Sequence, residues 1–247
     1  MSKIFDPDNG VFTFINKAID TLWVGALWCI ISFGPVLAAF FSENKIILII
    51  GLIISCFLLG PASTALYYAT VKVTRRSRSY ITKEFFRSLK LNFVVGGITS
   101  CIYGVFAYVL WIDFQYANSM IDEGNTIGNV MFVAFVAGSC FLIVSLAWIF
   151  PILSRFTVNL FGLFRNALLI STKHIIRTVL LLIIWGVVGI LCYVFQNYLL
   201  AVIFLVPVIP GIVAFTRSFV IEPILKKYAG ESAGDPEETG IDEWYRE

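Results

Sequence analysis

Long apolar stretches alternate with short polar segments along most of the chain. Six stretches of at least 18 residues contain no Asp, Glu, Lys or Arg: Thr21–Phe41, Ile46–Val71, Phe93–Ile112, Val130–Leu153, Thr178–Phe195 and Leu199–Thr216. A helix of about 20 apolar residues crosses the roughly 30 Å hydrocarbon layer, where a central charge costs about 2.5–3.5 kcal/mol. The pattern predicts an all-α polytopic transmembrane helical bundle with six spans arranged as three hairpins.

The composition excludes a water-soluble globular protein. Hydrophobic residues make up 59% of the 247 residues and charged residues 14%, whereas soluble chains average about 25% charged residues. We expect residues 1–228 to form the membrane domain. Residues 229–247 carry seven acids and are predicted to be a solvated, disordered cytoplasmic tail, in which Trp244 and Tyr245 form either a small docking patch or part of a plain tail.

The positions of the cations predict which side of the membrane each link faces. The link between the second and third stretches holds seven Lys or Arg residues and one acid, Glu84. The link between the fourth and fifth holds four cations and no acid, whereas the link Asp113–Gly128 holds three acids and no cation. Since cations near helix ends remain cytoplasmic, we expect both termini inside, with Lys45 alone of the 18 Lys and Arg residues outside.

Both basic links contain a predicted amphipathic helix. Ile81, Phe85 and Leu89 recur at four-residue spacing in the first link, and Leu160, Phe161, Phe164, Leu168 and Leu169 form an apolar face in the second. Such helices anchor on anionic lipid or offer a platform to a cytoplasmic partner, and the two roles are compatible. The candidate residues for partner or lipid-headgroup docking are Lys72, Arg75, Arg76, Lys83, Arg87, Lys90, Arg165, Lys173 and Arg177.

A proline interrupts the predicted cytoplasmic half of each even-numbered span. Proline removes a helical hydrogen bond and frees a carbonyl, which must find another partner within lipid. These positions are typical of ordinary kinked packing, or of a shared cytoplasmic-side cavity if the three hairpins bring them together. The candidate cavity residues are Gly60, Pro61, Ser63, Thr64, Tyr67, Tyr68, Pro151 and Pro210. The small residues Gly96, Ser100 and Gly104 predict close helix packing in the third span.

Ionisable and metal-ligating side chains are scarce in the apolar stretches. His174 is the one histidine, and the five cysteines show no CxxC spacing, so we expect no metal site and no cofactor. An enzyme needs a nucleophile with a base, or two acids, within reach of each other, and an ion-coupled carrier needs an ionisable group at mid-depth. We therefore expect no enzyme, no ion-coupled carrier and no nucleic-acid partner.

Three parts of the chain carry a family resemblance. The most specific is the block GPASTALYY at 60–68, followed by Lys72, Arg75 and FFRS at 85–88. The opening residues Phe14, Asn16, Lys17 and Asp20 leading to Leu27-Trp28, and RNAL at 165–168 with Lys173-His174 and Arg177-Thr178, are similar as well. Together these parts resemble the YesL family of bacterial membrane proteins, a domain of unknown function. In this chain residues 34–59 separate the opening motif from the GP block, a departure from many members.

The resemblance implies a genomic context but no site residues, because the family has no established catalytic or binding residues. Such proteins are typically encoded beside carbohydrate ABC importers and sugar-sensing two-component systems of Gram-positive bacteria. We therefore expect an accessory or interaction protein of the bacterial cell membrane, linked to carbohydrate import, that docks a permease or its ATPase. The alternative is a stand-alone facilitator for a neutral solute or lipid, which a continuous polar path near Pro61 and Pro151 would favour. The oligomeric state stays open.

Overall fold

The structure is a computed structural model that describes residues 10–75, 80–195 and 199–229. It contains helices and, within these ranges, no strand. The helices are α1 (Gly10–Phe40), α2 (Lys45–Thr74), α3 (Ile81–Leu91), α4 (Phe93–Asp122), α5 (Thr126–Arg155), α6 (Leu160–Lys173), α7 (Ile175–Phe195) and α8 (Leu199–Tyr228).

Six of these helices are long and apolar enough to cross a membrane, which confirms the predicted all-α class and agrees with the six predicted spans. They are α1, α2, α4, α5, α7 and α8, and they pair as the hairpins α1–α2, α4–α5 and α7–α8. The short helices α3 and α6 occupy the two basic links, as the apolar periodicity predicts. The tail beyond Ala229 and the turn between α7 and α8 lie outside the described residues.

The first two hairpins turn in the same way. In each, an asparagine in the turn caps the second helix: Asn44 accepts from the amide of Ile46, and Asn125 from the amide of Ile127, at 2.9 and 3.0 Å. The link Asp113–Gly128, whose charges are predicted to lie outside the membrane, is largely helical. α4 continues to Asp122 and α5 begins at Thr126, because residues 113–122 bond along the helix and Gly124, with φ +74°, closes a short turn.

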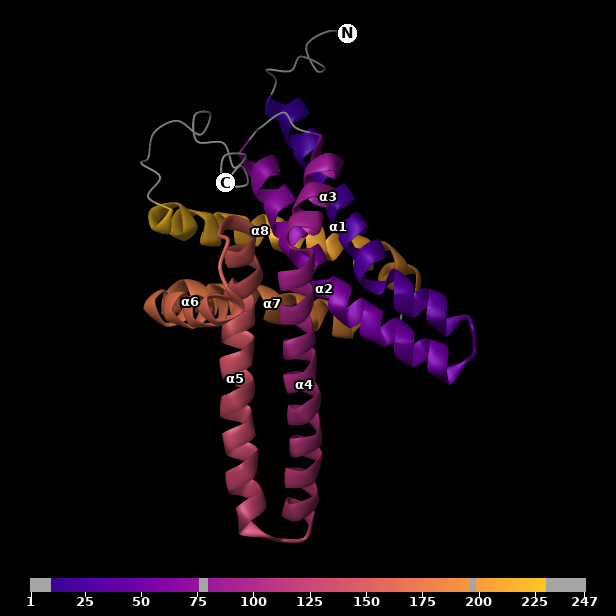
Figure 1. Cartoon of the computed structure of the whole chain (residues 1–247), viewed down its shortest axis with the longest axis vertical. Coiled ribbons are helices and arrows are strands. Elements are labelled where there is room, and N and C mark those ends of the chain that lie inside the picture. The colour runs from indigo at the N-terminus through magenta and orange to yellow at the C-terminus, as the bar shows by residue number, and fades with distance from the viewer. Residues whose placement is uncertain (1–9, 76–79, 196–198, 230–247) are drawn as a thin grey trace.

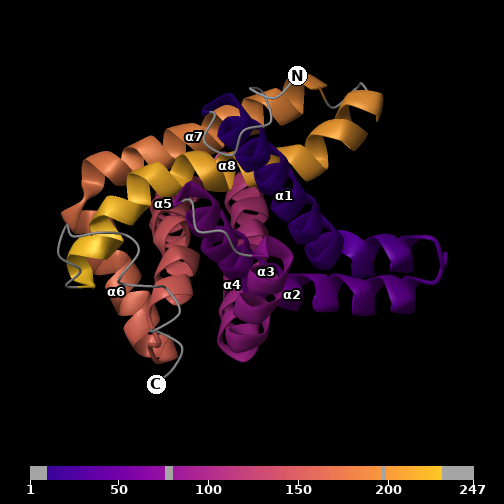
Figure 2. The ribbon, with the colours of Figure 1, turned by 90° about the horizontal axis from the view of Figure 1, so that it is seen from above.

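The three hairpins share one packed end and point away from it in different directions (Figures 1 and 2). The buried residues concentrate at that end, along Gly60–Val73 of α2, Gly96–Tyr103 of α4, Ser145–Arg155 of α5 and Ala214–Leu225 of α8. The core includes the fully buried side chains of Trp148, Tyr68, Leu163 and Ile221. Because α3 and α6 also lie there, this is the end that the cation pattern assigns to the cytoplasm.

The outer parts of the hairpins expose large apolar side chains. Val105, Tyr108 and Trp111 of α4 are 58–63% exposed, and Val130 and Val133 of α5 are both 67% exposed. Soluble monomers rarely show contiguous apolar patches above a few hundred Å². These surfaces therefore suit contact with lipid, as expected for spans.

Candidate functional site

The Gly60-Pro61 pair lies where α2 crosses α4 at close range. A Cβ on Gly60 would overlap the carbonyl oxygen of Gly96 and lie 2.8 Å from Ser100 Oγ, and a Cβ on Gly96 would lie 2.9 Å from the nitrogen of Pro61. Gly104, two turns beyond Gly96, faces Cys56 of α2. The small residues predicted for close packing therefore let α4 approach α2 backbone to backbone.

The carbonyls that two of the prolines free are bonded by side chains of neighbouring helices. Proline at position i leaves the carbonyl of residue i−4 without its helical donor. For Pro61 this is Phe57, whose oxygen accepts from Ser100 Oγ at 3.1 Å. For Pro151 it is Ala147, whose oxygen accepts from Arg217 Nη2 at 2.6 Å. The carbonyl that each of these two prolines frees therefore forms a hydrogen bond between two helices. Pro61, Pro151 and Pro210 all lie within continuous helices.

Removal of the Ser100 hydroxyl tests the first of these links. We expect Ser100→Ala to lower the free energy of unfolding by about 1–3 kcal/mol, because the part-buried Phe57 carbonyl would be left without that donor. The matched control is Ser139→Ala in α5, since the Ser139 hydroxyl bonds only within its own helix, to Phe135 at 2.8 Å. Unfolding in detergent followed by circular dichroism measures both, and equal losses would contradict the assignment.

A buried acid joins three helices at the packed end. Glu222 of α8 accepts through Oε1 from Arg75 of α2 and from Arg155 of α5. The side chains of Arg75, Arg155 and Glu222 are 11%, 2% and 13% exposed. A buried ion pair adds little net stability, but loss of one partner leaves an uncompensated buried charge. The contact therefore favours this one arrangement of α2, α5 and α8.

Two further polar groups lie near this acid. Arg217, one turn before Glu222, packs its guanidinium 4.8 Å from the centroid of the Trp185 ring on α7. The hydroxyl of Tyr67, which is 4% exposed, has no hydrogen-bond partner within the described part of the chain. Among the described residues, Arg75, Arg155 and Arg217 thus lie close to one carboxylate, that of Glu222.

A second buried ion pair fixes α3 to α2. Lys72 Nζ lies 2.9 Å from Glu84 Oε2, with the two side chains 6% and 12% exposed, and the Tyr68 hydroxyl lies 3.4 Å from the same oxygen. Phe85 beside Glu84 is fully buried against α1 and α2. The apolar side of α3 predicted from Ile81, Phe85 and Leu89 therefore packs on the bundle.

The structure places the candidate cavity residues inside packed helix contacts. Tyr67 and Tyr68 belong to the core, Thr64 bonds back to the Gly60 carbonyl at 3.0 Å, and Ser63 accepts from Trp28 Nε1 at 3.0 Å. Pro151 is buried. Gly211, which follows Pro210, packs against α1. A Cβ added to Gly211 would lie 3.4 Å from the Cα of Gly25. The two large cavities described below have other lining residues.

The candidate docking residues divide into an inner and an outer set. Lys72 and Arg75 point inward into ion pairs, and Arg76 lies outside the described residues. The outer set is on exposed or half-buried positions of α3, α6 and the start of α7: Lys83, Arg87, Lys90, Arg165, Lys173 and Arg177. We call these six residues the basic face. On α6 the buried side is formed by Leu163, Ala167 and Ile170, while Phe161 and Leu169 are exposed.

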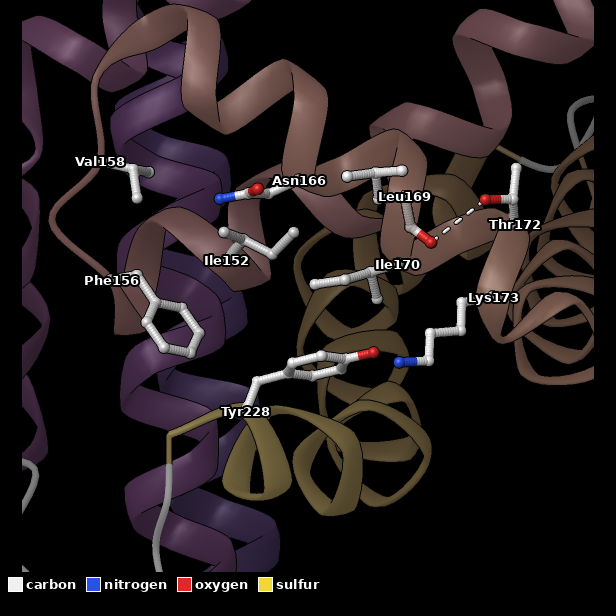
Figure 3. A pocket seen from close by; sticks show the side chains of 9 residues that line it. All are labelled: Ile152, Phe156, Val158, Asn166, Leu169, Ile170, Thr172, Lys173 and Tyr228. Carbon is white, nitrogen blue, oxygen red and sulfur yellow. Dashed lines mark hydrogen bonds between the residues drawn. The ribbon is translucent and has the colours of Figure 1, made fainter.

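Two cavities lie beside the packed helices. One of about 710 Å³ lies between the ends of α5, α6 and α8 (Figure 3). The other, of about 490 Å³, lies where the α4–α5 hairpin diverges from α2, with Leu59, Tyr103, Leu110, Leu142 and Leu146 in its mainly apolar lining. No group of three His, Cys, Asp or Glu residues suited to a metal ion occurs in the described part of the chain.

His174 joins α6 to α7 beside the C-terminal end of α8. Its Nε2 lies 3.3 Å from the Tyr228 hydroxyl. Partial burial lowers the pKa of the His174 imidazole below the ordinary 6.5, and the cations Arg177, Lys173 and Lys227 lower it further. The local potential is therefore positive.

The lowered pKa predicts a pH dependence of stability. Because the folded protein favours neutral His174, its stabilising contribution is complete above pH 6.5 and decreases as the pH falls below that value. We expect the melting temperature of the wild type to fall further between pH 7.5 and pH 5.0 than that of His174→Gln. Thermal melts of both proteins in one detergent measure this, and parallel losses would contradict it.

Comparison with known families covers the part of the chain that contains the α2–α4 crossing. Residues 18–114 match the model of the family described as "Protein of unknown function, DUF624". The match runs from α1 through α2 and α3 into α4 and includes Gly60, Pro61, the Lys72–Glu84 pair and Ser100. The chain is similar to this family over those residues, and the description assigns it no activity. No curated protein and no solved structure matches the chain.

Proposed function

We propose that the protein is an accessory or interaction component of the bacterial cytoplasmic membrane that docks a partner against the basic face. The observation that carries this proposal is the two-sided character of α3 and α6. Each packs one side on the bundle, through Phe85 or Leu163, and leaves Lys83 and Lys90, or Arg165 and Lys173, exposed on the other. A surface held on a packed core binds a partner with little ordering cost.

The identity of the partner is proposed from the resemblance to the YesL family. It suggests a component of a carbohydrate ABC importer, either a permease or its ATPase. The cation distribution supports the cytoplasmic orientation of the basic face and of both termini. The packed surroundings of Pro61 and Pro151 support a scaffold rather than a polar solute path, because helix contacts and ion pairs occupy that region.

Affinity purification tests this proposal. The full chain is recovered from native membranes in mild detergent and compared with Lys83→Glu/Lys90→Glu and with Arg165→Glu. The matched control is Lys45→Glu, which changes the exposed first residue of α2, at the opposite end of that helix. We expect an importer component with wild type and control, and a several-fold loss with the basic-face variants. Repeated recovery without any importer component contradicts the proposal, as does equal recovery with all variants.

Growth of a deletion strain on individual oligosaccharides adds a functional readout. We expect a defect on a subset of these sugars that wild type and Lys45→Glu complement and Lys83→Glu/Lys90→Glu does not. A strain that grows normally on every oligosaccharide taken up by such importers would contradict the link to carbohydrate uptake.

A stand-alone facilitator for a lipid or neutral solute is the second candidate. The observation that favours it is the cavity of about 490 Å³ beside α4 and α5, whose lining is mainly apolar. Flux through proteoliposomes that contain only this protein tests it. Leu142→Trp, which would fill the cavity, should abolish such flux if it exists, and absence of flux in the wild type excludes this candidate.

A further inference from the structure

The cleft between α5, α6 and α8 is lined by both apolar and polar side chains (Figure 3). Its volume is about 710 Å³, within the roughly 300–1,000 Å³ typical of small-molecule sites. Most of the lining is apolar, and the polar groups of Lys173 and Tyr228 lie together on one side of it, which suits an amphiphilic molecule (Figure 3). The apolar lining is Ile152, Phe156, Val158, Leu169 and Ile170, and the polar lining is Asn166, Thr172, Lys173 and Tyr228.

The polar end of the cleft carries positive charge. Figure 3 shows the amine of Lys173 and the hydroxyl of Tyr228 directed toward each other from α6 and α8, and Lys173 Nζ lies 5.3 Å from the centroid of the Tyr228 ring. Lys226 and Lys227 occupy the last turn of α8 beside it. Arg177 lies at the start of α7, close enough to His174 to add to this positive charge. An anionic group is therefore favoured here.

The surroundings of the cleft place it at the edge of the membrane. It lies where the candidate spans α5 and α8 end and α7 begins. Phe161 at the start of α6 and Ile176 at the start of α7 are 81% and 77% exposed, and Leu169 in the cleft wall is 54% exposed. Exposed aromatic and aliphatic side chains beside cations are typical of the boundary between headgroups and acyl chains.

We propose that this cleft binds one anionic phospholipid. The phosphate would be held by the Lys173 amine and the Tyr228 hydroxyl, and an acyl chain would lie along Ile152, Phe156 and Ile170. The apolar flanks favour a lipid over the acidic tail, which would bring its charges into acyl-chain surroundings. The inference goes beyond the docking of a protein partner, and it holds whether or not a partner binds α3.

Native mass spectrometry of the full chain in a neutral detergent tests the site. The first bound phosphatidylglycerol is compared with phosphatidylcholine of the same acyl chains. We expect phosphatidylglycerol to bind at least about tenfold more tightly, and Lys173→Glu to weaken it about tenfold or more, because one cation is lost and one repulsive charge is added. The matched control, Lys83→Glu on α3, should change the affinity by less than about twofold.

Further variants and ligands decide between the possible occupants. Tyr228→Phe, which keeps the ring, should weaken phosphatidylglycerol several-fold, and glycerophosphoglycerol without acyl chains should bind far more weakly than the lipid. Equal binding of the two lipids overturns the proposal, as do equal effects of Lys173→Glu and Lys83→Glu. It is also overturned if the headgroup alone binds as well as the lipid. A tenfold gain in lipid affinity in Trp244→Ser/Tyr245→Ser would show that the tail occupies the cleft instead.

Discussion

Glu222→Ala should destabilise the protein by about 3–5 kcal/mol. The substitution leaves the guanidinium groups of Arg75 and Arg155 in the interior without the carboxylate that now accepts from both. Removal of one partner of a buried ion pair carries this cost because the remaining charges stay desolvated. Reversible unfolding in a mild detergent with increasing denaturant measures the change.

Two comparisons make this prediction specific. Glu123→Ala removes an exposed acid from the turn between α4 and α5 and should change stability by less than about 0.5 kcal/mol. Replacement of Arg75, Arg155 and Glu222 together by Met should recover much of the loss, since packed apolar side chains often substitute for a buried ionic group. Equal stability of Glu222→Ala and Glu123→Ala would show that Glu222 does not hold α2, α5 and α8 together.

Gly60→Ala should be the most damaging small substitution in the α2–α4 crossing. The added Cβ would overlap the Gly96 carbonyl and crowd Ser100 Oγ at 2.8 Å, and backbone atoms cannot move aside as flexible side chains can. Overpacking of this kind costs about 1–3 kcal/mol or more. Unfolding of the full chain under the same conditions measures the loss.

Gly162→Ala in α6 is the matched control for Gly60→Ala. An added Cβ at Gly162 meets nothing within 4 Å, and alanine in an open helical position gains up to about 1 kcal/mol over glycine. The two variants should therefore change stability in opposite directions. A Gly60→Ala protein as stable as the wild type would mean that α2 and α4 are farther apart than the structure has them.

The number and order of the spans could be predicted from the sequence because they depend on local composition. An apolar stretch without charges determines a span regardless of what it packs against. The same holds for α3 and α6, whose four-residue periodicity lies within one link. The apolar pattern does not show where the turn itself lies, because polar residues such as Asp113 continue α4 as far as Asp122.

The inner ion pairs could not be predicted because their partners are far apart in sequence. Arg75 and Glu222 are separated by 147 positions, and Arg155 and Glu222 by 67. From sequence alone Lys72 and Arg75 look like the other cations of a basic link, and α8 looks as if it ends before Arg217. In the structure α8 continues to Tyr228, and its buried Glu222 is paired with Arg75 of α2 and Arg155 of α5. The sequence does contain one indication of these pairs: Glu222 is an acid that follows an apolar span at the end where cations predominate.

The role of the prolines was predictable only in part. Their positions indicate which carbonyls are freed, but the donors Ser100 and Arg217 come from α4 and α8, on other hairpins. The choice between kinked packing and a cavity therefore required the tertiary structure. At Pro61 and Pro151 the helices are joined by these bonds, which supports the packing interpretation.

Cysteine labelling in intact cells tests the central claim, a cytoplasmic basic face, most directly. Lys83→Cys on α3 and Glu123→Cys in the α4–α5 turn are both exposed positions and are placed in a chain whose five native cysteines are replaced by alanine or serine. A membrane-impermeant maleimide should label Glu123→Cys in intact cells and Lys83→Cys only after permeabilisation. Labelling of Lys83→Cys in intact cells, with protection of Glu123→Cys, would place the basic face outside the cell and contradict the proposed function.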